Sequence, residues 1–193
     1  MERNNSGKIK ELAENGRLCE IYFGGKCTGD FELGKIIACG EECVLILSVN
    51  RYAVSDGIRM IYADDICRIS ENSKYIKKYE FLTEKYGMDT GCTEYRKYFG
   101  ENGCGMTDLF EFARSKDKAV SLSLCGSDEY DITGFVVSYD DTTVTVREIG
   151  EYGDDEGTSF LNINDIDYCS CDAWAERSKA DLFRQNNDYT VDL

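Results

Sequence analysis

Apolar and polar residues alternate along several short stretches of the chain, which is the pattern of β-strands with one buried face. In the clearest stretch, Val120, Leu122 and Leu124 alternate with serines. Polar turns rich in Gly, Asp and Asn separate these stretches, as in antiparallel strands joined by tight connections. The pattern predicts strands at residues 18–23, 31–39, 43–49, 58–63, 66–70, 119–124, 132–139, 143–149, 158–163 and 166–170.

Helical spacing precedes and follows each group of strands. A short helix is expected at residues 7–14, and a second from Thr107 or Asp108 to Ala113, because either polar residue can cap a helix. After the last strand of each group, Ser73 and Asp172 are the expected caps of two longer helices. The stripes expected to dock these helices are Tyr75, Tyr79, Leu82 and Tyr86 in the first and Trp174, Ala175, Leu182 and Phe183 in the second.

The second half of the chain repeats the pattern of the first. Gly34 aligns with Gly134 at an offset of 100 residues, and a shift of one residue upstream brings Leu18 over Ala119. Nothing is inserted between Gly34 and the end of the strands, so the collinear matches indicate a duplicated unit. The sequence therefore predicts a first domain at residues 1–86, a linker rich in Gly and polar residues at 87–106, and a second domain at 107–193.

Two short motifs in the second copy carry a family resemblance. The first is Gly134-x-Val136-x-x-Tyr139-Asp140, and the second is Leu161-Asn162-Ile163-Asn164-Asp165-Ile166. With the order of one helix and five strands, they resemble the motifs of the Sm-like (LSm) family. The resemblance implies a mostly β (α+β) protein of two tandem Sm-like five-stranded small barrels, each with flanking helices. A generic SH3-like small barrel gives much of the same pattern.

The resemblance stops at the residues with which the Sm family holds RNA. The family's RNA-binding Asn falls on Val44 and Val144. Its Arg-Gly pair falls on Tyr62-Ala63 and Asn162-Ile163, so neither copy keeps the amide or the guanidinium that contacts RNA. A net charge of -15 also repels polyanions. We therefore expect no nucleic acid partner, and an RNA-binding Sm-like protein is only an alternative.

What the resemblance does imply is association through exposed strand edges, fourth strand to fifth. Such edges pair with another chain or another copy. A protein partner or self-association is therefore the expected mode of action.

The composition removes several classes of enzyme. The chain has no His, which excludes Ser-His-Asp and Cys-His catalysis and His metal ligation. No motif pairs a nucleophile with a base, and no glycine-rich phosphate loop opens a helix after a strand. We expect no catalytic residues and no cofactor.

Ten cysteines raise the question of compartment and metal. No apolar signal core follows Met1 and no apolar run approaches the roughly 18 residues of a membrane span, so we expect a cytoplasmic protein without membrane association. Cys39-x-x-x-Cys43 and Cys169-Ser170-Cys171 lack the spacing of zinc knuckles and are expected to be buried packing thiols. We expect no bound metal, and a thiol metal-binding protein is the second alternative.

The loops of the second copy supply the candidate interaction residues. These are Asp140 and Asp141 in the turn after the second strand, and Asn162 and Asn164 around the second motif. The acidic loop at 148–156 is expected to be solvated, and the lysines and tyrosines of 74–86 to form a docked helix rather than a nucleic-acid surface. The sequence thus predicts a non-catalytic binding or assembly module that uses barrel edges and loops.

Overall fold

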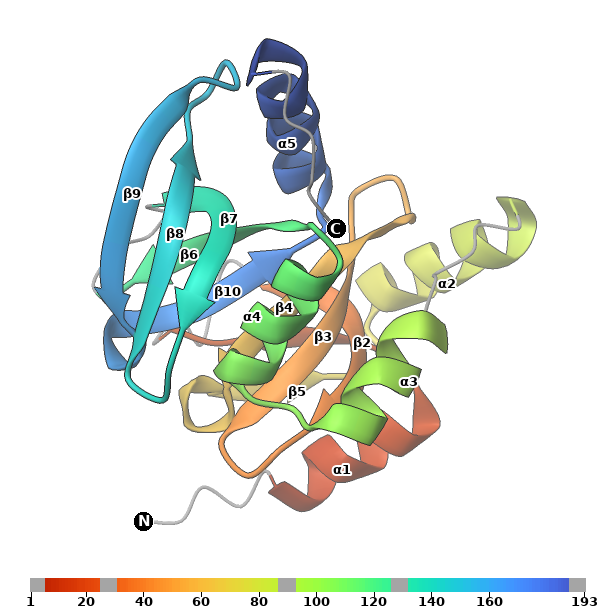
Figure 1. The fold of residues 1–193 in the computed structure, drawn as a ribbon. Coiled ribbons are helices and arrows are strands. Elements are labelled where there is room, and N and C mark those ends of the chain that lie inside the picture. Colours follow the sequence, from red (N-terminus) through yellow and green to blue (C-terminus); the bar gives the residue numbers. More distant parts are fainter. Residues whose placement is uncertain (1–5, 25–30, 87–92, 126–131, 188–193) are drawn as a thin grey trace. The chain divides into compact units, whose positions relative to one another are not determined.

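The chain divides into two compact units, Met1–Gly105 and Met106–Leu193 (Figure 1). The computed structural model describes residues 6–24, 31–86, 93–125 and 132–187. Of the described residues, 38% are helical and 40% lie in strands, so the expectation of a mostly β protein is wrong. The helices that precede the sheets are slightly longer than expected, and Thr93–Asn102, which was expected to be linker, forms a further helix.

The first unit begins with a helix, continues through five strands and ends with two helices. The described part of segment 87–106, where a linker was expected, holds the second of these helices, and it packs on β2. The elements are α1 (Ser6–Asn15), β1 (Leu18–Tyr22), β2 (Glu32–Cys39), β3 (Cys43–Val49), β4 (Ser55–Tyr62), the 3-10 turn η1 (Ala63–Asp65), β5 (Arg68–Ser70), α2 (Lys74–Tyr86) and α3 (Thr93–Asn102).

The second unit has the same order of one helix, five strands and a closing helix. Its elements are α4 (Met106–Ser115), β6 (Ala119–Leu124), β7 (Ile132–Tyr139), β8 (Thr143–Ile149), β9 (Asp155–Asn162), the 3-10 turn η2 (Ile163–Asp165), β10 (Ile166–Cys171) and α5 (Trp174–Asn187).

Each unit builds an open antiparallel sheet. The strand order is β5-β1-β2-β3-β4 in the first unit and β10-β6-β7-β8-β9 in the second. Among the described strands, the fourth and fifth of each unit stand at opposite ends of this order, and closure of a barrel needs those ends to pair. The expected pair of closed small barrels is therefore wrong. Turn spacing identifies which strands are neighbours, but the curvature that closes a sheet depends on packing across its faces.

The two units share their backbone irregularities at the offset seen in the sequence. Asn72 and Asp172 both have positive φ, 58° and 61°, at the start of the closing helix. Gly57 and Gly157 have φ of 73° and 98° in the fourth strands. The second strand of each unit has its register shift at the same place, between Ile36 and Ala38 and between Val136 and Ser138. The internal repeat is thus a repeat of structure.

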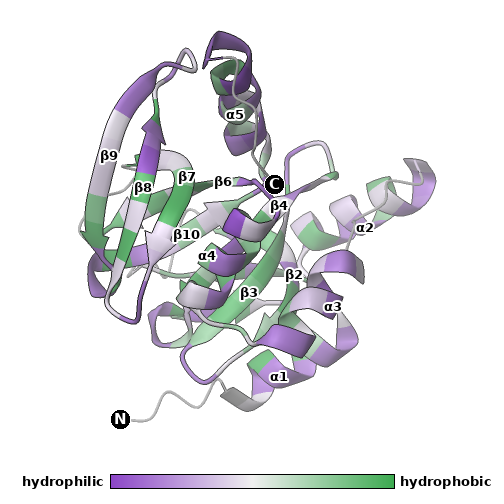
Figure 2. Cartoon of the chain, viewed as in Figure 1, coloured by the Kyte–Doolittle hydropathy of each residue, from purple (hydrophilic) through white to green (hydrophobic). Residues whose placement is uncertain are grey.

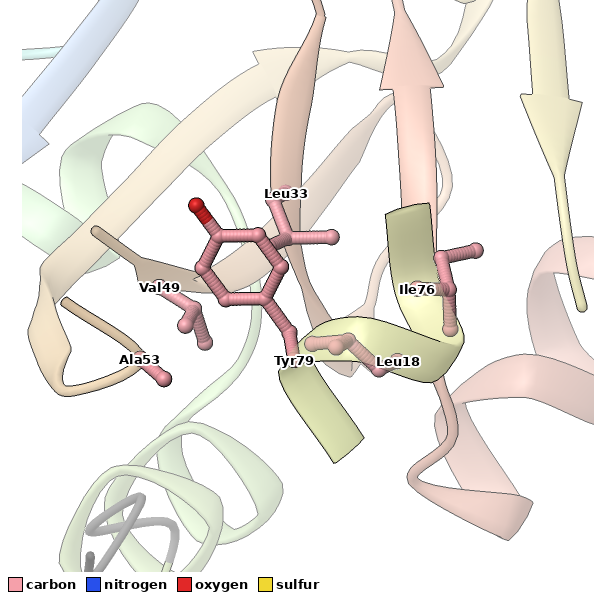
Figure 3. Packing of buried hydrophobic residues seen from close by; sticks show 6 residues of the cluster. All are labelled: Leu18, Leu33, Val49, Ala53, Ile76 and Tyr79. Atoms are coloured by element: carbon pink, nitrogen blue, oxygen red, sulfur yellow. The ribbon is translucent and has the colours of Figure 1, made fainter. Parts of the chain in front are cut away.

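The closing helix of the first unit docks through an apolar cluster. Ile76 and Tyr79 of α2 are buried against Leu18, Leu33 and Val49 of the sheet (Figure 3). The Tyr79 ring lies among the aliphatic side chains, and its hydroxyl donates to the carbonyl of Arg51 at 3.3 Å. The expectation that the tyrosines of this helix serve docking is confirmed for Tyr79.

The closing helix of the second unit docks through a face that matches the expected one only in part, since Phe183 is buried as predicted. Trp174 and Leu182 are 70% and 41% exposed, although they belong to the predicted stripe. The buried residues are Glu176, Ala180 and Phe183, which follow one another at helical spacing. The predicted stripe is the more apolar of the two, so packing against the sheet, and not hydropathy alone, decides which face of the helix is buried.

Strand β6 is buried on both faces, whereas the sequence predicted one exposed face. Ser121 and Ser123 are 2% and 0% exposed. The Ser121 hydroxyl lies 3.0 Å from that of Thr133 on β7, and this hydrogen bond lowers the cost of burying it.

Candidate interaction surface of the second unit

The four loop residues singled out from the sequence come together at one end of the second sheet. Asp140 and Asp141 lie in the β7–β8 turn, Asn162 ends β9 and Asn164 lies in η2. Thr143 pairs with Asn162 in the sheet, and the Ile163 N–H donates to the Thr142 carbonyl at 2.8 Å. Both loops therefore border the same end of the sheet.

The Asp140 side chain forms hydrogen bonds within its own turn. Its carboxylate accepts hydrogen bonds from the N–H groups of Thr142 and Thr143, each at 2.8 Å, and from both threonine hydroxyls, at 2.9 and 3.1 Å. These donors, led by the backbone N–H of Thr142, lower the pKa of Asp140 to about 2. The residue holds the β7–β8 turn in shape, and its ionised form is the one that does so.

Of the other three loop residues, one stabilises a turn and two are exposed. The Asn162 side-chain oxygen accepts from the Asn164 N–H at 3.2 Å and caps the 3-10 turn. The side chains of Asp141 and Asn164 are exposed. This end of the sheet is thus a pair of hydrogen-bonded turns that presents polar groups to solvent.

The feature that sequence reasoning missed is Phe160. It lies on β9 and is 80% exposed. It stands opposite Thr145 of β8, and Thr145 stands opposite Ser138 of β7, so its neighbours across the sheet are small polar residues. Met60, at the same place in the first unit, is 0% exposed. Both residues are hydrophobic, so hydropathy alone does not separate them.

Strand β9 forms the outer edge of the second unit's sheet. It pairs with β8 and stands last in the strand order (Figure 1). Its charged residues, Asp155 and Glu156, lie at its N-terminal end, and Gly157–Asn162 contains neither Pro nor a charged side chain, the residues that commonly guard an exposed edge. A register shift between Glu148 and Ile149 disturbs only its first residues, so Gly157–Asn162 remain in regular pairing. Among the described strands, β8 is the one neighbour of this part of the edge.

The N-terminal end of β9 is acidic. Figure 2 shows the strand hydrophilic at this end and hydrophobic toward the other. The Asp155 carboxylate is 2.7 Å from the Arg147 guanidinium, which lowers the pKa of Asp155 by hydrogen bonding. Asp154 and Glu156 beside it are exposed. The edge therefore runs from a negative end to an aromatic one.

Most of the cysteines that the structure describes are buried or half-buried. The eight that the structure describes carry thiols rather than disulfides. Cys169 and Cys171 are both 0% exposed, as expected of packing thiols, and burial raises the pKa of Cys171. Within the described segments, no three Cys, Asp or Glu side chains gather closely enough to hold a metal ion.

Every helix in the described part of the chain is too short or too polar to cross a bilayer. Comparisons with protein-family models, with curated proteins and with solved structures found no match to this chain.

Proposed function

We propose that the protein is a non-catalytic binding module whose second unit takes up an extended, basic segment of a protein partner as an added strand along β9. The observation that carries the proposal is that β9 stands last among the described strands of its sheet and has an 80% exposed Phe160 on it.

The backbone of β9 supports strand addition. Every second residue of an edge strand directs its N–H and C=O groups away from the sheet, where a partner strand can pair with them. The regular stretch Gly157–Asn162 is long enough for several such bonds. The Sm-like family, which the sequence resembles, also associates through its fourth strand, and β9 is the fourth strand of its unit.

The side chains of β9 supply specificity. Phe160 offers a large apolar anchor, and aromatic anchors dominate the energetics of many interfaces. Burying an exposed phenylalanine contributes about 1.5–3 kcal/mol. The acids Asp154 and Glu156 at the other end attract lysine or arginine.

Charge favours a basic partner over a second copy of this chain. With a net charge of -15, two copies repel each other as they approach. A basic segment is instead steered toward the acidic end of the edge.

Binding of a labelled synthetic peptide tests the proposal. The peptide alternates valine and lysine and has the length of β9, and its affinity is measured by fluorescence anisotropy. We expect Phe160→Ala to weaken binding about tenfold to a hundredfold, which corresponds to the loss of the buried ring. Tyr52→Ala, which removes a 62% exposed aromatic ring from the first unit, is the matched control and leaves binding unchanged.

A peptide with glutamate in place of lysine should bind far more weakly than the basic peptide. The proposal is wrong if Phe160→Ala binds like the wild type, or if the acidic peptide binds as well as the basic one. Light scattering of the chain alone tests whether β9 instead pairs with a second copy of the chain. A wild-type dimer that becomes a monomer in Phe160→Ala would indicate self-association and contradict the proposal.

A further inference from the structure

The second unit contains a cavity of about 250 Å³ between the α4–β6 turn and the helix α5. It lies away from β9, and the proposed strand addition does not use it. Charged side chains of both signs line it, among them Asp117, Lys118, Asp172, Glu176, Arg177 and Arg184.

Three of the cations around the cavity already have acceptors within the unit. The Lys118 ammonium is 2.9 Å from the Asp172 carboxylate, and the Arg184 guanidinium is 2.8 Å from that of Asp117. Arg177 donates to the backbone carbonyl of Asp172. An anion entering the cavity would have to compete with these internal carboxylates.

Glu176 is the exception among the acids. Its side chain lines the cavity and the residue is only 2% exposed. No donor among the described residues reaches its Oε2 atom. A buried carboxylate oxygen without a donor is costly, and natural structures retain such a group where something else satisfies it.

The internal repeat shows what this site looks like without the acid. At the offset of 100 residues, Glu176 corresponds to Ile76, which is 1% exposed in the apolar cluster under α2 (Figure 3). With the shift of one residue, Ala119, which lines the cavity, corresponds to Leu18 of the same cluster. Hydrocarbon fills the position in the first unit, whereas the second unit has a carboxylate and open space.

We propose that this cavity binds a small organic cation whose ammonium or guanidinium group donates to the Glu176 carboxylate. Such a group brings a charge-assisted hydrogen-bond donor and the opposite charge to the Glu176 carboxylate. The volume lies below the usual range of drug-sized pockets, so the ligand is small. A metal ion fits less well, because in the described part of the chain no three-ligand group of Cys, Asp and Glu is present.

Calorimetric titration of the full chain with butylguanidinium, butylammonium and butyrate tests the site, because the three probes share one alkyl chain and differ in charge. We expect the cations to bind and butyrate not to bind. Glu176→Gln should weaken binding of the cations at least tenfold, since a charge-assisted hydrogen bond is lost. Glu42→Gln, an exposed acid in the first unit, removes the same charge and serves as the control.

Glu176→Ile separates a binding role from a structural one, since it installs the residue of the first unit. We expect it to abolish cation binding and to raise the thermal unfolding midpoint, because it removes a buried carboxylate that lacks a donor. The inference is overturned if neither cation binds, if butyrate binds as tightly as the cations, or if Glu176→Ile binds like the wild type. A lowered midpoint in Glu176→Ile together with unchanged cation affinity would assign Glu176 to the fold alone.

Discussion

Phe183→Ala removes the side chain that fastens α5 to the second sheet. Phe183 is 0% exposed and clusters with Ala119, Phe135, Ile149 and Ala180. Its ring meets that of Phe135 edge-to-face, with centroids 5.6 Å apart. Arg147 lies on β8, and its guanidinium is 5.0 Å from the centroid of the Phe183 ring. The contacts of Phe183 therefore extend to a third strand.

The cost of this substitution follows from the burial of the ring. The transfer free energy of a fully buried phenylalanine is about 1.5–3 kcal/mol. A cavity of roughly 100 Å³ at about 24 cal/mol per Å³ adds about 2 kcal/mol. The lost edge-to-face pair contributes a further ~0.5–1.5 kcal/mol. Since the surroundings relax in part, we expect the second unit to lose about 4 kcal/mol of unfolding free energy.

Urea unfolding followed by tryptophan fluorescence measures this loss in the right unit. The chain has one tryptophan, Trp174, at the start of α5, so its signal reports on this helix. Circular dichroism on the same samples shows whether the first unit unfolds separately. Leu182→Ala, at the neighbouring 41% exposed position, is the control and should cost less than about 1 kcal/mol. A loss below about 1 kcal/mol for Phe183→Ala would refute the docking of α5 through this ring.

Three other measurements probe separate parts of the structure. In Gly134→Ala the new Cβ would lie 2.1 Å from the backbone oxygen of Arg147, so we expect a loss of about 1–3 kcal/mol or more in urea unfolding. The pKa of Asp140 is lowered to about 2 in the folded protein, whereas an ordinary Asp has a pKa of about 3.9. Asp140 therefore stabilises the fold fully at pH values above about 3.9, and this contribution is lost as the pH falls toward 2. Thermal unfolding of Asp140→Ala should therefore show a smaller decline over that range than the wild type, and an equal decline would contradict the assigned hydrogen bonds. Burial raises the pKa of Cys104 to about 12, so mass spectrometry after brief alkylation at pH 8 should find exposed Cys125 modified well before it.

Element order was open to prediction from the sequence because it depends on local signals. Alternating hydrophobicity, turn acids and glycines located the strands to within a few residues, and α1 begins at Ser6 where the pattern placed a helix from residue 7. The repeat offset of 100 residues also held for positive φ angles at paired positions such as Asn72 and Asp172. These features depend on neighbouring residues only.

The candidate site was predicted in part. Asp140 and Asp141 were located correctly in the turn after the second strand, because turn residues are readable from the chain. That the loop after Asn162 borders the same end of the sheet was not predicted. Their use in holding the turns was not foreseen, since it depends on donors supplied by the folded backbone. Phe160 and Glu176 were missed, because the residue type alone predicts a buried phenylalanine and an exposed glutamate, the opposite of what the structure shows.

The sequence by itself determined the duplicated order of helix and strands, because periodicity and turn chemistry act over a few residues. Only the tertiary structure decided that the sheets stay open, with β9 as an edge, since closure depends on curvature and on what packs across each face. Tertiary packing also buried Glu176 where the first copy buries Ile76. The same helical position is thus apolar core in one unit and a carboxylate beside a cavity in the other, a difference that appears only when the helix is docked on its sheet.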